Sequence, residues 1–375
     1  MITTINNKHN KLNVPNLRFK EFQGEWEYFL INDVCSEFKS GKNIKADSVF
    51  ECGEYPVYGG NGLRGYTSSY NHEGSYVLIG RQGALCGNVR SVYGKTYITE
   101  HAIAVAGNEK SNTNFLHYLF LKMNLGQYSD QSAQPGLAVN KLLKLKVALP
   151  IISEQTKIAK FLSLLDERIA TQSKIIEKMQ TLIKGIVDST ILRKEKNAIV
   201  GDVCSISEQI RAEANIDDII TVRLHGNGVC KSSAENLQLG ATQYYRRRAG
   251  QLIYGKQNFH NGAIGIVPIN LDNGITSKDI PSFDIDEMKC NSVYLLAQLQ
   301  SPQYYKPAEA LTTGTGSKRL KEETFLKMPI VLPNKREQDN IATLIISISA
   351  NLDQAKKMLD LFSIQKQYLL RQMFI

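Results

Sequence analysis

The sequence has no apolar run long enough to cross a membrane, and its residues 1–12 are polar. We therefore expect neither a signal peptide nor a membrane anchor. The six cysteines never form a C-x-x-C pair, which argues against a zinc site and against a disulfide framework. Together these absences favour a protein of the reducing cytoplasm.

Catalytic motifs are also missing. The six histidines lack H-x-x-x-H spacing, and there is no G-x-S-x-G sequence and no Asn-Pro-Pro-aromatic or Asp-Pro-Pro-aromatic tetrapeptide of the amino-methyltransferase kind. Residues 60–65 fit G-x-G-x-x-G, but no helical pattern follows them. Residues 250–256 resemble a Walker A motif until Gln257 replaces the required Ser or Thr. We expect no catalytic residue, no cofactor site and no metal site in this chain.

Charge gives a weaker indication. The formal net charge is +9 and the isoelectric point is near 9.0. A basic balance favours an acidic partner such as a nucleic acid, although many soluble proteins are this basic without one. The length of 375 residues leaves room for two or three hydrophobic cores.

What the chain does contain is a long internal repeat. The phrase P-x-x-x-E-Q-x-x-I-A begins at Pro150 and again 183 positions later at Pro333. Upstream, equivalent residues pair at smaller offsets: Asn114/Asn291, Ile103/Ile280 and Thr99/Thr276 at 177, Gly80/Gly255 at 175, and Cys35/Cys204 at 169. The offset grows by 14 from 169 to 183, so we expect insertions in the loops of the second copy. A repeat of this length indicates a duplicated unit of one domain and one helix.

Each copy of the phrase opens an apolar stripe with alternating spacings of four and three residues, the pattern of a coiled coil. The first stripe is Ile158, Leu162, Leu165, Ile169, Ile176, Met179, Ile183 and Ile186, with the polar Gln172 filling the place between Ile169 and Ile176. Its counterparts are Ile341, Ile345, Ile348, Leu352, Leu359, Phe362, Lys366 and Leu369, with Ala355 opposite Gln172. Only Lys366 interrupts the second stripe. We predict two antiparallel helices, each about 50 Å long. Two ordinary amphipathic core helices are the alternative.

Upstream of each stripe the pattern is mixed. In the first copy, β-rich runs at 76–79 and 98–105 precede a helical pattern at 114–123; in the second copy the same order occurs at 251–254, 274–280 and 291–299. We predict an α+β chain with two globular domains, two long antiparallel coiled-coil helices and an internal pseudo-twofold repeat. The expected boundaries are a tail at 1–24, a first domain at 25–150, a central helix at 151–195, a second domain at 196–333 and a C-terminal helix at 334–375.

Basic residues beside glycine, glutamine and tyrosine are the candidate DNA contacts. They are Arg64, Arg81, Gln82, Arg246, Arg247, Lys256, Gln257, Lys318 and Arg319. A cation followed by glutamine recurs at equivalent places in the two copies. The cation suits a phosphate or a guanine, and the amide suits an adenine edge. For each loop alone, a solvated turn is the alternative.

Several phrases in this sequence resemble a known family, the specificity subunits of Type I restriction–modification enzymes. The resemblance covers nearly the whole chain. It is carried by the duplicated P-x-x-x-E-Q-x-x-I-A phrase, by Tyr55-Pro-Val-Tyr-Gly-Gly-Asn-Gly, by Tyr76-Val-Leu-Ile-Gly-Arg-Gln-Gly-Ala, and by the opening Val14-Pro-Asn-Leu-Arg-Phe-Lys-Glu-Phe-Gln-Gly-Glu-Trp26. No single phrase is specific, but together they are.

The resemblance implies a non-catalytic subunit with two target-recognition domains, each reading one half of a split double-stranded DNA target. Two modification subunits, which use S-adenosylmethionine to methylate adenine, would grip the helical regions. Restriction subunits that use ATP and Mg²⁺ would join them to cleave DNA. The partner-binding residues that we expect on this basis are Glu154, Gln155, Glu337 and Gln338.

Two other functions remain open from the residues alone. A coiled-coil scaffold with protein-binding globular ends would show no salt-sensitive affinity for DNA, whereas a DNA reader that makes several phosphate contacts would lose affinity steeply as salt rises. An enzyme with an unrecognised site would show turnover by the purified chain.

Overall fold

The computed structural model describes residues 2–4, 13–130, 135–232, 242–314 and 318–375. The chain divides into two compact units. Unit 1 is Met1–Ser173 with Lys357–Ile375, and unit 2 is Lys174–Lys356. The division falls inside the two long helices, α4 (Ile152–Val187) and α8 (Lys335–Met373), so each helix contributes one half to each unit.

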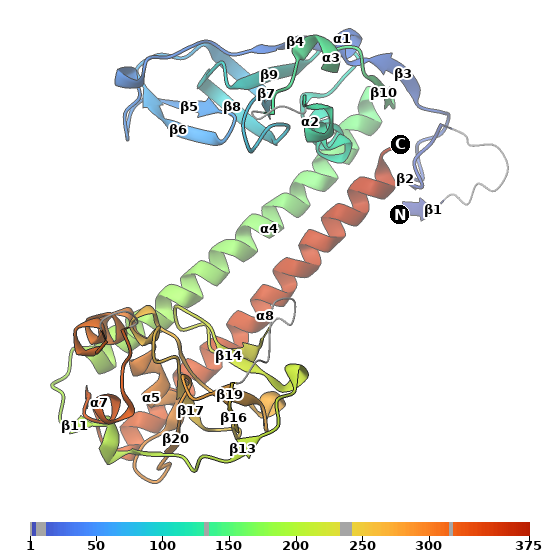
Figure 1. Cartoon of the computed structure of the whole chain (residues 1–375). Coiled ribbons are helices and arrows are strands. Elements are labelled where there is room, and N and C mark those ends of the chain that lie inside the picture. Colours follow the sequence, from blue (N-terminus) through green and yellow to red (C-terminus); the bar gives the residue numbers. More distant parts are fainter. Residues whose placement is uncertain (1, 5–12, 131–134, 233–241, 315–317) are drawn as a thin grey trace. The chain divides into compact units, whose positions relative to one another are not determined.

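Unit 1 is built on a six-stranded sheet with the order β4-β9-β7-β8-β5-β6 (Figure 1). Its strands are β1 (Ile2–Thr4), β2 (Leu17–Phe19), β3 (Glu27–Leu30), β4 (Cys35–Ser40), β5 (Tyr55–Gly59), β6 (Gly62–Thr67), β7 (His72–Gly80), β8 (Val89–Ile98), β9 (Ala102–Gly107) and β10 (Lys146–Leu149). Its shorter helices are α1 (Ile31–Val34), α2 (Thr113–Met123) and α3 (Val139–Leu142). All pairings in the large sheet are antiparallel except β5 with β8.

Helix α2 covers this sheet and carries the core of unit 1. It begins at Asn112, whose side chain accepts hydrogen bonds from the backbone N–H groups of Asn114 and Phe115. Its residues Phe115, Leu116, Leu119 and Phe120 are buried. They pack with Val77, Ile79 and Val105 of the sheet and with Ile158, Leu162 and Leu369 of the long helices.

Unit 2 repeats this plan with shorter strands. Its strands are β11 (Ala198–Ile199), β12 (Cys204–Ile206), β13 (Arg211–Ala212), β14 (Ile220–Val222), β15 (Val229–Lys231), β16 (Tyr244–Arg246), β17 (Leu252–Tyr254), β18 (Ile264–Ile266), β19 (Ile275–Ser277), β20 (Ser282–Ile285) and β21 (Pro329–Ile330). Its shorter helices are α5 (Ser292–Leu299), α6 (Pro302–Tyr305) and α7 (Glu322–Leu326). The sheet β12-β20-β17-β18 matches β4-β9-β7-β8 of unit 1, and α5 matches α2.

Strand registers fix the equivalence of the two copies. Val77 of β7 pairs with Val105 of β9 in unit 1, and Leu252 of β17 pairs with Phe283 of β20 in unit 2. With these two pairs taken as equivalent, the sequence offset between the copies is 175 from β7 to β17 and 178 from β9 to β20. Gly80 N–H donates to Asn88 O and Gly255 N–H donates to Ala263 O, so the two glycines hold equivalent places in the two units.

The same registers correct three predicted pairs. Between β9 and β20 the offset is 178, so Ile103/Ile280 and Thr99/Thr276 were each placed one residue out of register. The N-cap of α5 is Asn291, which makes Asn112 and not Asn114 its equivalent. Sequence alone could not show where the loop insertions lie.

Two predicted strand runs are interrupted. Residues 98–105 contain the end of β8, a turn at 99–101 and the start of β9, and 274–280 ends in a turn before β20. Each turn shows one backbone hydrogen bond at the same place, from Ala102 N–H to Thr99 O in unit 1 and from Ile280 N–H to Ser277 O in unit 2.

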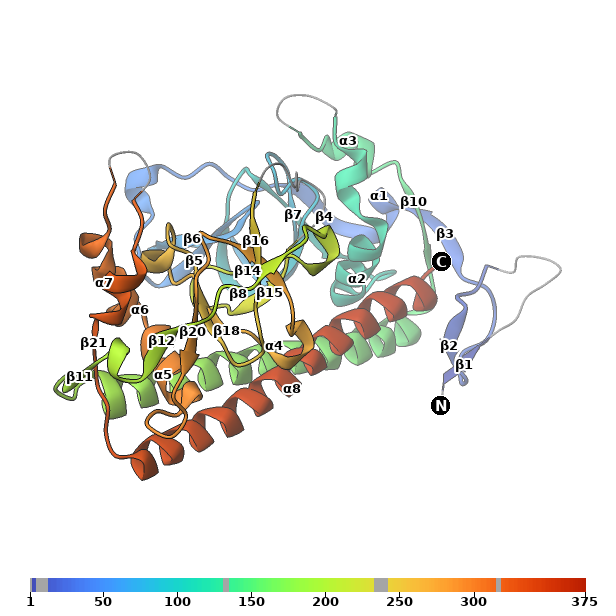
Figure 2. The same cartoon turned by 60° about the horizontal axis from the view of Figure 1, so that its bottom comes forward.

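The helices α4 and α8 lie side by side (Figures 1 and 2). In unit 1 the first half of α4 meets the last half of α8, where Asp166 pairs with Lys366. In unit 2 the last half of α4 meets the first half of α8, where Ile183 and Ile345 line one pocket. The helices are therefore antiparallel, as predicted. Every member of the two predicted stripes is buried or half-buried. Among the residues that the structure describes, no helix has the length and apolarity needed to span a bilayer.

Candidate nucleic-acid interface

Three loops of unit 1 meet at one edge of the sheet. The backbone N–H of Arg81, after β7, donates to the carbonyl of His101 at 3.0 Å. Gly60, in the turn between β5 and β6, packs against the same carbonyl, which would lie 2.8 Å from any Cβ added there. This close approach explains why a glycine stands at position 60.

Cationic side chains gather around this edge. Arg64 crosses the hairpin, so that a Cβ on Gly59 would lie 2.9 Å from its Cδ. Arg90 lies on the neighbouring strand, and a Cβ on Gly62 would lie 2.9 Å from its Cζ. Arg64 and Arg90 are exposed and Arg81 is half-buried. The structure therefore brings Arg64 and Arg81 together, and it adds Arg90, which sequence reasoning missed because no glycine-rich loop marks it.

Gln82 belongs to the same edge. Its backbone bridges to Gly136, and its side chain is exposed. The carbonyl of Arg81 accepts a hydrogen bond from Leu137 N–H at 2.9 Å. The cation and the amide are thus held on a short segment that is tied to the sheet on both sides.

Unit 2 holds its own cation–glutamine segment by the same two backbone bonds. Lys256 N–H donates to Asp279 O at 2.9 Å, and Leu320 N–H donates to Lys256 O at 2.9 Å. These bonds correspond to Arg81 with His101 and Leu137 with Arg81. The segment therefore occupies one structural position in both copies, and the side chain of Gln257 is exposed there as that of Gln82 is in unit 1.

The electrostatics of the two segments differ. Lys256 Nζ lies 2.7 Å from Glu322 Oε1, and its side chain is only 11% exposed. Arg319 pairs with Asp279 at 3.3 Å, and Lys318 pairs with Glu309 at 3.5 Å. The last two pairs are well exposed, so solvent and salt screen them and leave the cations able to exchange partners. Lys256 is the least accessible of these cations.

The basic run at 244–248 is split between surface and core. Arg246 and Arg248 are exposed, but Arg247 is completely buried. The guanidinium of Arg247 donates to Thr276 Oγ1 at 2.8 Å, to Ser282 Oγ at 3.0 Å and to the Ile280 carbonyl at 3.0 Å. Burial lowers the pKa of Arg247 to about 10. The predicted DNA contact at Arg247 is therefore wrong, because alternation along an extended segment turns it inward.

Three of the four predicted partner-binding residues are also buried. Gln155 accepts a hydrogen bond from Asn112 N–H at 2.8 Å and donates to the carbonyls of Lys110 at 2.9 Å and Pro150 at 2.8 Å. Gln338 repeats this arrangement, with Asn291 N–H as donor and the carbonyls of Lys289 and Pro333 as acceptors. These bonds join the start of each long helix to the N-cap of the helix that covers the sheet.

Glu154 has a structural role as well. It is fully buried, and its two oxygens accept hydrogen bonds from Arg18 at 2.8 and 2.7 Å. The prediction of partner binding is thus wrong for Glu154, Gln155 and Gln338, since none has surface to offer. Glu337 is partly exposed and pairs with Lys194.

The repeated cysteines lie away from the candidate interface. Burial raises the pKa of both Cys35 and Cys204 to about 12, so their thiols stay protonated at neutral pH. Within the described residues, no group of three or more His, Cys, Asp or Glu side chains is placed to hold a metal ion.

Comparison with known proteins shows what this architecture is similar to. Residues 23–181 match the family described as the Type I restriction modification DNA specificity domain. The Type I restriction enzyme EcoprrI specificity subunit of Escherichia coli is 42% identical over 204 residues, which are 52% of this chain and 47% of that protein. This chain thus spans about half the length of that relative.

Two further proteins match over most of the chain. The Type I restriction enzyme MjaVIII specificity subunit of Methanocaldococcus jannaschii is 23% identical over 389 residues, 90% of each chain. The crystal structure of the Type-I restriction-modification system S subunit from M. genitalium has the same fold, with a TM-score of 0.68, 14% identity, and coverage of 96% of this chain and 99% of that one. Residues 23–181 are thus similar to the Type I restriction modification DNA specificity domain, and the chain as a whole has the fold of the S subunit from M. genitalium.

Proposed function

We propose that this chain recognises a bipartite DNA sequence for a Type I restriction–modification complex, with each unit reading one half of the target. The observation that carries the proposal is the cation–glutamine segment, which two equivalent backbone bonds hold at one position in both units. Exposed cations surround it in each unit, and phosphate contacts by such cations position a protein on DNA. The differing loops around the segment would supply different base contacts.

The constant part of the repeat supports a second step. The offset is 183 throughout the long helices, whereas it varies among the loops. In a two-part DNA reader, the protein spacing sets the half-site spacing. We infer that the paired helices determine how many unread base pairs separate the half-sites.

Partner subunits would bind the outer faces of the long helices. Large apolar side chains are exposed there: Leu164, Leu182, Leu344, Ile346, Leu361, Ile364 and Tyr368. Clusters of exposed apolar residues commonly mark protein interfaces. We propose that two modification subunits occupy these faces, that S-adenosylmethionine, ATP and Mg²⁺ belong to the modification and restriction subunits, and that the complex acts in the cytoplasm. On this proposal the chain itself catalyses no step.

A base-resolution map of N6-methyladenine tests the proposal. DNA from cells that contain the cognate modification subunit should carry a split methylated motif with this chain and lack it without the chain. Replacing residues 28–149 by the equivalent segment of a relative should change one half of the motif only. Simultaneous change of both halves would refute the two-reader assignment, and a salt-insensitive interaction with DNA would favour a protein-binding scaffold.

A further inference from the structure

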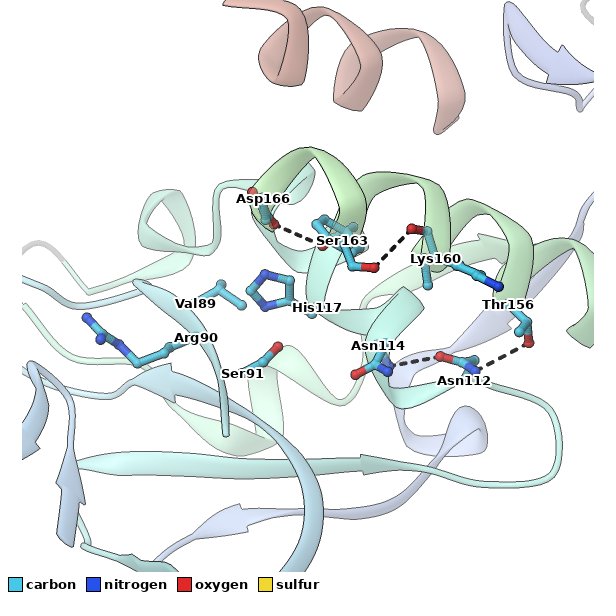
Figure 3. A pocket seen from close by; sticks show the side chains of 12 residues that line it. Val89, Arg90, Ser91, Asn112, Asn114, His117, Thr156, Lys160, Ser163 and Asp166 are labelled. Carbon is cyan, nitrogen blue, oxygen red and sulfur yellow. Dashed lines mark hydrogen bonds between the residues drawn. The ribbon is translucent and has the colours of Figure 1, made fainter. Parts of the chain in front are cut away.

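An ionic cluster interrupts the apolar seam in unit 1. Lys366 Nζ of α8 lies 2.5 Å from Asp166 Oδ1 of α4, and the hydroxyl of Tyr118 donates to Asp166 Oδ2 at 2.9 Å. The ammonium group of Lys366 also lies 5.8 Å from the centre of the Tyr118 ring. Asp166 lines a pocket of about 540 Å³ beside His117 (Figure 3). Both oxygens of Asp166 are thus occupied at the helix–helix contact.

The equivalent position in unit 2 has no charge. The residue 183 positions after Asp166 is Ser349, and the residue 183 positions before Lys366 is Ile183. Ile183 and Ser349 line one pocket of about 570 Å³ in unit 2, so the two positions meet there as they do in unit 1. One copy of the repeat therefore pairs Asp with Lys, and the other pairs Ser with Ile.

This asymmetry bears on a problem that any duplicated helix pair faces. Because α4 and α8 carry equivalent stripes, α4 could pair with α4 of a second chain, and α8 with α8. Pairing of α4 with α4 would set Asp166 against Ile183 of the second chain at two places. Pairing of α8 with α8 would set Lys366 against Ser349 at two places. Each arrangement leaves a partly buried charge without its partner, which is costly.

We propose that the Asp166–Lys366 ion pair selects α8 of the same chain as the partner of α4. The ion pair thereby disfavours association with a second copy of this chain through α4 with α4 or through α8 with α8. Single polar or ionic groups in an apolar seam are known to specify partner and register at some cost in stability. The side chains of Lys366 and Asp166 are 22% and 32% exposed. The two charges therefore keep part of their hydration, and forming the ion pair does not carry the full cost of burying them in a core. The inference concerns chain association and holds whether or not the chain reads DNA.

The test uses full-length chains that carry two different affinity tags and are expressed together. The variant combines Asp166→Ser with Lys366→Ile, which copies the uncharged pair of unit 2 into unit 1. Loss of selection should raise the fraction of one tagged chain captured with the other by about tenfold over the wild type. A folded variant that shows the wild-type captured fraction would overturn the proposal.

The matched control is Glu167→Ser with Lys357→Ile, which removes one acidic and one basic residue from exposed positions of the same two helices. It should stay at the wild-type captured fraction. Capture by the control to the same extent as by the test variant would mean that added apolar surface, and not the lost ion pair, drives association. That result would also overturn the proposal.

A second measurement does not depend on the uncharged variant being folded. Asp166→Lys and Lys366→Asp each place like charges at the contact within one chain. Expressed together, the two variants can restore both ion pairs only between chains. We expect each to capture the other about tenfold more than itself. Equal capture in all combinations would show that the ion pair does not select the partner.

Discussion

One buried glutamine anchors each long helix to its domain. Gln155→Leu removes the partner of Asn112 N–H and of two carbonyls in unit 1. Because buried polar groups left without a partner lose their solvation, we expect a loss of about 3 kcal/mol in the free energy of unfolding. Urea unfolding followed by circular dichroism measures it. Gln354→Leu, on an exposed face of α8, is the control and should change stability by less than about 0.5 kcal/mol.

Adjacent arginines in unit 2 should have separable effects. Arg247→Met removes the hydrogen bonds to Thr276 Oγ1, Ser282 Oγ and the Ile280 carbonyl, so we expect a loss of about 3 kcal/mol in unfolding free energy. Thr276 Oγ1 still donates to the Ile280 carbonyl in the variant. Arg246→Gln removes an exposed charge and should leave stability unchanged while weakening DNA binding. Thermal unfolding and a filter-binding titration separate the two. Equal stability of both variants would contradict the buried role of Arg247.

His117 makes the stability of unit 1 depend on pH. Burial, with the nearby Lys366 charge, lowers its pKa from 6.5 to about 4, although Asp166 acts in the opposite direction. Between these pH values the unfolded chain binds more protons at this residue than the folded chain does, so stability falls as pH falls from 6.5 to 4. The ring is partly exposed, so we expect a loss of about 2 kcal/mol over this range.

The control for this pH effect comes from the repeat. His117 corresponds to the apolar Leu296 of unit 2, since the N-caps Asn112 and Asn291 are equivalent. His117→Leu should remove about 2 kcal/mol of the loss between pH 6.5 and 4, leaving the part due to carboxylates. Urea unfolding at several pH values measures the difference. An unchanged pH slope in the variant would mean that the His117 proton does not control stability.

At the scale of elements, neighbouring leucines of α4 should behave differently. Leu162 is fully buried in the core of unit 1, whereas Leu164 is 50% exposed. Leu162→Ala should cost about 3 kcal/mol of unfolding free energy, because it removes packed methyl groups and leaves a cavity. Leu164→Ala should cost less than about 0.5 kcal/mol but weaken binding of a partner on that face. Denaturant titrations and co-purification with the modification subunit test both.

The long helices could be predicted because their pattern is periodic over many turns. Prolines at positions 150 and 333 precede α4 and α8, and the four–three spacing follows the seam through both units. The turns at 99–101 and 278–281 could not be placed, because polar residues in a β-rich run look the same whether the strand continues or reverses. Strand breaks are decided by pairing with distant segments.

The candidate site was predictable in position but not in detail. The cation–glutamine segments were found because they recur, and recurrence needs no knowledge of the fold. Burial of Arg247, Gln155 and Gln338 could not be predicted, because charged and amide residues are usually exposed. Their burial depends on partners such as Ser282 and Asn112, which lie far from them in sequence.

At the scale of the whole molecule, the chain is one plan used twice with different surfaces. The same sheet order and the same glutamine anchor occur in both units. Among the residues that the structure describes, no ion pair is found for Arg64 or Arg90 of unit 1. In unit 2, Lys318 pairs with Glu309 and Arg319 pairs with Asp279. Two units that share a scaffold and differ in such charges can recognise different sequences independently.

The proposed independent reading of DNA by the two units has a measurable consequence. Arg64→Gln in unit 1 and Lys318→Gln in unit 2 each remove one proposed phosphate contact. Each should lower the magnitude of the slope of log K against log salt by about 1, and the double variant should lower it by about 2. Because the two residues belong to different units, their effects on binding free energy should add within about 0.5 kcal/mol. Titrations of target DNA at several salt concentrations provide both quantities. A double variant no weaker than either single variant would mean that the two units do not contact DNA independently.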